Sequence, residues 1–160
     1  MPRLSLLGGV LVLAATTIVT TSAPASADPE QPAAVAAVSG CWGDAGTVGP
    51  NPHGYSYGAA KYCHNFRGGD VYKAQYGSFT VPVGYLNAGT NWFVCQVRNN
   101  ENPPVPEGYR NNIWLYTQAD RAYEGTQRGW GEFPANRVSS STGDYEPIPG
   151  LPWCHDVRPL

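Results

Sequence analysis

Charged residues are scarce in this chain, and the basic ones form no cluster. Lys, Arg, Asp and Glu together make up 14% of the 160 residues. Removing Arg3 with the N-terminal leader described below takes the ten basic residues to nine, against twelve acidic ones. A weakly acidic chain without a Lys/Arg patch lacks the electrostatic footprint of nucleic-acid and anionic-membrane binders. We therefore expect neither of those partners.

Long apolar runs are also missing, except at the N-terminus. There Arg3 precedes an apolar stretch from Leu4 to about Val19, and Ala25-Ser26-Ala27 follows. A positive start, an apolar middle and a small-residue A-x-A end are the three parts of a secretory signal peptide. The stretch falls short of the roughly 20 apolar residues of a spanning helix. We expect residues 1–27 to be a signal peptide and the mature chain to be secreted, without a membrane anchor.

No segment keeps an amphipathic helical period for three turns, because nineteen Gly and fifteen Pro divide the chain into short pieces. Several pieces show strand alternation instead, which predicts an all-β domain. We expect strands at 70–75, 78–83, 91–98, 112–118, 121–124 and 129–133, with a helical turn at 134–137 and either a helical turn or a strand at 59–64. In 91–98, Phe93, Cys95 and Val97 should share one face.

The flanking segments have little periodicity. Residues 28–40, which contain no aromatic side chain, should be a disordered lead-in. Residues 41–58 are turn-rich and should form an irregular segment held by a disulfide. Three prolines in residues 145–154 predict an extended tail. The expected organisation is a single disulfide-bonded β domain over 41–155, followed by a short tail at 156–160.

The cysteine count is even, and all four cysteines lie in the mature part: Cys41, Cys63, Cys95 and Cys154. In an exported protein this count predicts two disulfides, for which three pairings are possible. Our preferred pairing joins Cys41 to Cys63 and Cys95 to Cys154, closing loops of 22 and 59 residues. Each bridge would destabilise the unfolded chain by roughly 3 to 4 kcal/mol on the loop-entropy model.

No catalytic or metal-binding motif is recognisable. Cys63-His64 and Cys154-His155 are adjacent pairs, but neighbours in an extended chain point to opposite faces and are badly placed to share a zinc ion. The serines at 139–141 lack any nucleophile context. Paired carboxylates for glycoside hydrolysis could come from Asp70, Glu101, Glu107, Asp120, Glu124, Glu132 and Asp144, but the sequence does not show which of them meet. We expect no metal, no cofactor and no catalytic residue.

Three pieces occur in an order that resembles bacterial SH3-like domains of exported envelope proteins. They are GTNWFVCQ at 89–96, NNIWLYT at 111–117 and GWGEFPANRVS at 129–139. The resemblance spans about residues 71–139 and implies a small SH3-like β-barrel core. Its departures are a longer loop at 99–108 and the polar Glu132 in the last strand. The chain also resembles small secreted actinobacterial proteins that end in Pro-Gly-Leu-Pro-x-Cys, which supports the pairing of Cys95 with Cys154.

Five Trp and ten Tyr exceed what so small a domain can fully bury. If Ile113 and Leu115 face the core, Trp114 and Tyr116 face outward. Flat exposed rings suit the binding of sugars or peptides. The alternative is that the tail, with Leu151 and Trp153, covers them. The candidate ligand-binding residues are Trp92, Trp114, Tyr116 and Trp130.

These observations predict a secreted, monomeric, non-catalytic binding module for a cell-envelope polymer or an extracellular peptide. A second hypothesis is a secreted inhibitor of a protease or another hydrolase. It would present the loop at 99–108, which contains Pro103-Pro104, as a rigid ligand. A third hypothesis is a small extracellular hydrolase.

Overall fold

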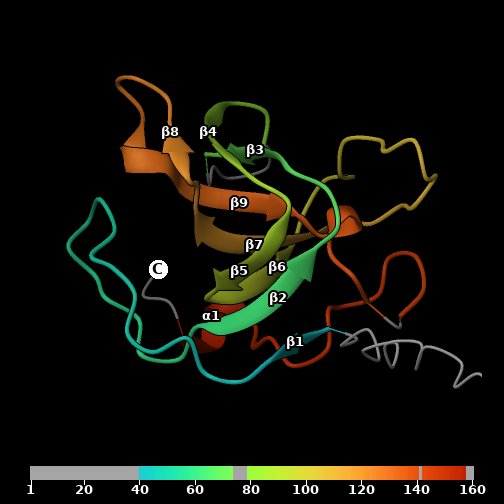
Figure 1. Cartoon of the computed structure of the whole chain (residues 1–160), viewed down its shortest axis with the longest axis horizontal. Coiled ribbons are helices and arrows are strands. Elements are labelled where there is room, and N and C mark those ends of the chain that lie inside the picture. Colours follow the sequence, from blue (N-terminus) through green and yellow to red (C-terminus); the bar gives the residue numbers. More distant parts are fainter. Residues whose placement is uncertain (1–39, 74–78, 141, 158–160) are drawn as a thin grey trace, which may run out of the picture. The chain divides into compact units, whose positions relative to one another are not determined.

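The computed structural model describes residues 40–73, 79–140 and 142–157 (Figure 1). All of them belong to one compact unit, Val35–Leu160. The predicted signal peptide, the lead-in up to residue 39, residues 74, 75 and 78 of two predicted strands, and the end of the tail at 158–160 lie outside the described residues.

The described chain is mostly β, as the strand alternation between its Gly and Pro residues predicts. It forms two antiparallel sheets. The smaller sheet has the order β1-β2-β5 and the larger the order β6-β7-β9-β3-β4-β8 (Figure 1). The strands are β1 (Cys41–Trp42), β2 (Lys61–Asn65), β3 (Gly69–Tyr72), β4 (Pro82–Leu86), β5 (Gly89–Phe93), β6 (Cys95–Arg98), β7 (Ile113–Gln118), β8 (Arg121–Ala122) and β9 (Trp130–Pro134). Neither sheet closes on itself within the described residues.

Helical structure in the described ranges is short. Two 3-10 turns, η1 (Gln127–Gly129) and η2 (Ala135–Arg137), flank β9, and α1 (Cys154–Val157) ends the described chain. The turn predicted at 134–137 is therefore confirmed, and residues 59–64 take the strand alternative as β2. Among residues 40–73, 79–140 and 142–157, no helix has the length and hydropathy that a membrane crossing requires.

The predicted single strand at 91–98 is two strands in different sheets. Phe93, the last residue of β5, pairs with β2, whereas Cys95, the first residue of β6, pairs with β7. Between them, the Val94 amide donates to Tyr116 O at 2.8 Å. Residues 93–96 are all at most 3% exposed. Alternation fails here because the chain passes between two sheets and is covered on both sides.

The strand predicted at 78–83 starts later, at Pro82, and continues to Leu86. Proline lacks the amide hydrogen that a ladder needs, so it is tolerated as the first residue of a strand. After it, Gly84 pairs with both Val71 and Ala122, which makes β4 an interior strand.

Both preferred disulfides are confirmed. Cys41 is bonded to Cys63 and Cys95 to Cys154, with Cα atoms 4.3 and 4.8 Å apart. The first bridge joins β1 to β2 and thereby fixes the start of the irregular segment at 41–58. The second fastens Cys154, at the end of the proline-rich tail at 145–154, to Cys95 in β6.

The buried apolar side chains form two clusters on the two sides of β7. Ile113 and Leu115 belong to the first cluster, together with Phe93, Phe133 and Ile148. The second cluster contains Tyr116 and its neighbours, Tyr57, Ala60, Val94, Cys95, Trp130 and Cys154. The two faces of β7 are thus divided as its alternation predicts, but both faces are covered.

Candidate functional site

Three of the four predicted ligand-binding residues are buried. Trp114 is 0%, Trp130 1% and Tyr116 3% exposed, and Trp92 is partly buried. The expectation that Trp114 and Tyr116 face solvent is therefore wrong. Their rings lie on the face opposite Ile113 and Leu115, but other parts of the chain cover that face.

Trp92, Tyr116 and Trp130 pack into one aromatic cluster with Tyr57. The Trp130 ring centroid lies 5.3 Å from that of Trp92 and 5.5 Å from that of Tyr116, and Tyr57 meets Tyr116 edge-on at 5.8 Å. Asn51 Nδ2 donates to the hydroxyls of Tyr57 and Tyr116 at 2.8 and 3.2 Å. The irregular segment at 41–58 therefore supplies part of the cover, and Cys154 and Val157 of α1 pack against the same cluster.

Trp114 packs separately, between Tyr72 and Phe79. Its ring meets theirs edge-on, with centroids 5.5 and 4.8 Å apart. The indole Nε1 donates to Asn100 O at 2.7 Å, which satisfies its one donor. A ring held in this way contributes core packing and has no free face for a ligand.

The part of the tail at 148–151 covers the first cluster. Ile148 and Leu151 are 2% and 6% exposed and pack with Phe93 and Leu115. The buried Gln96 side chain donates to Ile148 O and Leu151 O and accepts from Ile148 N, at 3.1, 2.6 and 2.8 Å. This amide clamp holds the tail against β6.

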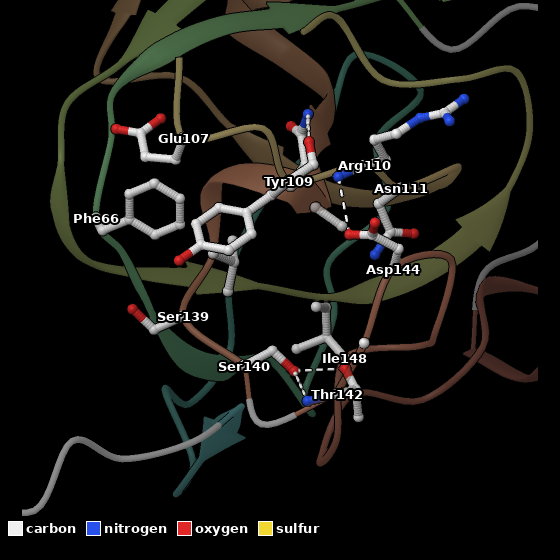
Figure 2. A pocket seen from close by; sticks show the side chains of 14 residues that line it. Phe66, Glu107, Tyr109, Arg110, Asn111, Ser139, Ser140, Thr142, Asp144 and Ile148 are labelled. Carbon is white, nitrogen blue, oxygen red and sulfur yellow. Dashed lines mark hydrogen bonds between the residues drawn. The ribbon is translucent and has the colours of Figure 1, made fainter. Parts of the chain in front are cut away.

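A cleft of about 410 Å³ lies where the tail meets the loop between β6 and β7 (Figure 2). Its lining comes from four places in the chain: Phe66 after β2, residues 107 and 109–111 of the loop, residues 135, 136 and 138–140 around η2, and residues 142–144 and 148 at the start of the tail. Loop and tail are joined because Arg110 N donates to Asp144 Oδ1 at 3.0 Å and Asn111 Nδ2 donates to Glu146 O at 3.1 Å. Among the residues that the structure describes, none that lines this cleft belongs to a strand.

One wall of the cleft is aromatic. The rings of Phe66 and Tyr109 meet edge-on with centroids 5.7 Å apart, and Figure 2 shows them side by side. Tyr109 is 55% exposed, the highest exposed fraction among the large hydrophobic side chains of the described residues. Beside it, the Arg67 guanidinium donates to both carboxylate oxygens of Glu107, from Nε to Oε2 at 3.3 Å and from Nη2 to Oε1. These hydrogen bonds hold the pKa of the Glu107 carboxyl below its usual value. The wall therefore presents an aromatic face next to a neutralised carboxylate.

The floor of the cleft is apolar except for one amide. Ala135, Val138 and Ile148 are 2–5% exposed. Between the first two lies Asn136, itself 5% exposed, whose Nδ2 donates to Pro103 O and Tyr109 O at 2.9 and 3.2 Å. These two bonds fix the orientation of the amide, and its Oδ1 is out of contact with solvent and has no hydrogen-bond partner among the described residues.

The rim is polar, and the charge of Arg110 is paired with that of Glu101. Arg110 Nε donates to Glu101 Oε1 at 2.8 Å, and Figure 2 shows the Arg110 side chain directed away from the other lining residues. Hydrogen bonds from Arg110, and then from the Tyr145 hydroxyl, lower the pKa of Glu101. On the opposite side, the Ser140 and Thr142 hydroxyls are hydrogen-bonded to each other at 2.6 Å. The rim therefore offers hydroxyl groups together with the carboxylate of Asp144, whose Oδ1 accepts the Arg110 amide.

The loop at 99–108, the predicted inhibitory loop, is attached to the body by buried side chains. Asn102 and Val105 are 4% and 7% exposed, and Asn102 Nδ2 donates to Ile113 O at 3.0 Å. Its role as an inhibitor stays a prediction. What the structure adds is that this loop supplies Glu107 to the cleft wall and Pro103 O to the Asn136 amide.

The zinc alternative requires thiolate ligands, and all four sulfurs are engaged in disulfides. Within the described ranges, no group of three His, Cys, Asp or Glu side chains is arranged to hold a metal ion. Comparison with known proteins finds no matching family model, no matching curated protein and no matching solved structure. The resemblance to SH3-like domains therefore stays a prediction.

Sequence reasoning missed the cleft. Its residues come from segments that look like ordinary turns and polar loops. The sequence predicts the short turn that contains Asn136, but it does not indicate that this turn lines a cleft. One weak signal was present, because Tyr109 is an aromatic residue in an otherwise polar loop with no strand alternation around it.

Proposed function

We propose that this chain is a secreted, non-catalytic binding module whose cleft holds a segment of a cell-envelope polymer. The observation that carries the proposal is an open cleft of about 410 Å³ whose wall carries the exposed Tyr109 ring and whose floor is apolar. The ring offers a stacking surface. Binding sites typically combine a largely apolar lining with a few fixed polar groups in a volume of about 300 to 1,000 Å³.

A binding role is favoured over hydrolysis by the state of the carboxylates. Glu107 and Asp144 both line the cleft, and a glycosidase needs one carboxyl with a raised pKa as its general acid. The pKa of Glu107 is instead lowered by Arg67. Asp144 Oδ1 accepts the Arg110 amide and serves to join loop and tail. These carboxylates therefore suit the ordering of the rim better than proton transfer.

Secretion and an SH3-like core are part of the same proposal. The N-terminal A-x-A leader and the two disulfides support export. The three pieces behind the SH3-like resemblance fall on β5–β6, β7 and β9–η2, and β6, β7 and β9 are direct neighbours in one sheet. Their adjacency supports an SH3-like arrangement of this core.

Co-sedimentation with purified bacterial cell walls at low salt tests the function. The protein should pellet with the walls, and Tyr109→Ala should reduce the pelleted fraction several-fold while leaving the fold intact, because the Tyr109 ring is exposed. Tyr55→Ala is the matched control, since Tyr55 is also an exposed tyrosine, at 48%, and does not line the cleft. Absence of the wild-type protein from the pellet, or equal retention of Tyr109→Ala, would refute the proposal.

A further inference from the structure

Resting on the proposed function, we propose that the cleft prefers stretches of envelope glycan in which an amino sugar carries a free amino group instead of an acetylated one. The ammonium group pairs with the carboxylate of Asp144, while a sugar ring of the same glycan stacks on Tyr109. Both side chains line the cleft, and both are exposed.

Asp144 brings a negative charge into the lining. Its Oδ1 accepts the Arg110 backbone amide at 3.0 Å, which fixes the carboxylate where the loop meets the tail. Asp144 belongs to none of the ion pairs among the described residues, which are Arg67–Glu107, Arg110–Glu101 and His155–Asp156. The carboxylate can therefore accept a charged hydrogen bond from a ligand without breaking an ion pair.

The second charge in the lining, Glu107, is already balanced. Hydrogen bonds from Arg67 and, more weakly, the charge of Arg137 lower the pKa of the Glu107 carboxyl. Arg137 does not line the cleft, and its Nη1 donates to Gly68 O at 2.8 Å. Figure 2 shows Glu107 and Asp144 on opposite sides of Tyr109. The cations that balance Glu107 are therefore separated from Asp144 by the aromatic ring.

The third charge, Arg110, has its partners outside the cleft lining. Its Nε donates to Glu101 at 2.8 Å, and its guanidinium lies 5.3 Å from the ring centroid of Tyr145. The hydrogen bond to Glu101 is the main reason why the pKa of Arg110 is raised, and the charge of Asp144 contributes least. With both pairs neutral, the lining keeps the negative charge of Asp144. Electrostatic complementarity then favours a cationic ligand.

An amino sugar fits this cleft better than the side chain of a lysine does. Tyr109 is 55% exposed and offers a flat face to a sugar ring. Thr142, two residues before Asp144, also lines the cleft, and its hydroxyl is hydrogen-bonded to that of Ser140 at 2.6 Å. The carboxylate thus belongs to a segment with hydroxyl groups. In an amino sugar the amino group is likewise next to hydroxyls, whereas a lysine ammonium ends an apolar stem.

Acetylation of the sugar should weaken binding for two reasons. An ammonium group has three N–H donors and a positive charge, and an acetamido group has one N–H donor and no charge. A carboxylate paired with an ammonium group makes the stronger, charge-assisted kind of hydrogen bond. The free amine is therefore the form that Asp144 selects.

NMR titration of the oxidised, secreted form of the protein at mildly acidic pH, which keeps sugar amines protonated, tests the inference. The probes are the β-1,4-linked trimers of glucosamine and N-acetylglucosamine, and the peptide Ala-Lys-Ala blocked at both ends. The glucosamine trimer should bind about fivefold or more tightly than the acetylated trimer at low salt. This preference should shrink as the salt concentration rises, because salt screens an exposed pair.

Asp144→Asn removes the charge but keeps an Oδ1 to accept the Arg110 amide, so it should abolish the preference and leave the fold intact. Asp120→Asn is the matched control. Asp120 is also exposed and accepts a backbone amide, that of Asn87 at 2.7 Å, but it does not line the cleft. This control should keep the preference of the wild type.

Equal or tighter binding of the acetylated trimer, or a preference that is independent of salt or survives in Asp144→Asn, would overturn the inference. Tighter binding of the lysine peptide than of the glucosamine trimer would overturn the choice of a sugar. Retention on cell walls without binding of either trimer at millimolar concentration would overturn the inference and leave the proposed function standing. Failure to bind both walls and trimers would overturn the function as well.

Discussion

Replacing Gln96 with leucine should destabilise the domain far more than a strand-surface glutamine would. Gln96 is 3% exposed, and its amide group makes three hydrogen bonds to the tail. Leucine has a similar volume but leaves the Ile148 N–H, the Ile148 C=O and the Leu151 C=O without these partners. Each buried unpaired group costs about 1 to 3 kcal/mol.

Counting each group at the lower limit of this range gives a conservative value. Three groups at about 1 kcal/mol each give an expected loss of about 3 kcal/mol in the free energy of unfolding. The matched control is Gln118→Leu, since Gln118 is also a strand glutamine but makes a single exposed hydrogen bond, to Arg128 O at 2.9 Å. This control should stay within about 0.5 kcal/mol of the wild type.

Urea unfolding of the oxidised variants, followed by circular dichroism, provides the free energies. Limited proteolysis gives a second readout, because a released tail should be cut between residues 140 and 150 in Gln96→Leu before the rest of the domain. If Gln96→Leu loses no more stability than Gln118→Leu and its tail resists cleavage, the amide clamp does not hold the tail.

Three further results are expected. Trp130→Ala should lose about 3 to 5 kcal/mol of stability in urea unfolding, because it empties a fully buried ring site, and a loss below about 1 kcal/mol would contradict the aromatic cluster. Replacing Cys95 and Cys154 with alanine should cost about 4 kcal/mol, since that bridge closes a loop of 59 residues; unchanged stability would contradict this value. In Arg67→Gln, the pKa of the Glu107 carboxyl, followed by NMR titration, should rise toward its usual value. The ion pair should therefore stabilise the fold at neutral pH and be lost as the pH falls through the lowered pKa, and an unshifted pKa would show that Arg67 is not its cause.

Local patterns predicted the parts of the fold that depend on local chemistry. The β-branched and aromatic residues of 112–118 predict β7, and the separation of Ile113 and Leu115 from Trp114 and Tyr116 on its two faces is correct. The even cysteine count and the family likeness led to the right disulfides. These features need no knowledge of distant contacts.

The errors come from contacts between distant segments. Tyr116 is covered through Asn51, 65 residues away, in a stretch that has no periodicity to reveal its packing. Strand alternation predicts which side chains share a face, but it carries no information on whether another segment lies over that face. The cleft depends on such contacts even more, because Phe66, Tyr109, Asn136 and Asp144 converge only in the folded chain.

A backbone and side-chain amide NMR titration with solubilised cell-wall glycan locates the binding surface most directly. Binding in the cleft predicts that the largest shift changes fall on residues 107–111 and 135–144, including the side-chain amide of Asn136 in the cleft lining. Shift changes centred on Trp92 and Trp130, or none at saturating glycan, would contradict the assignment of the cleft as the binding site.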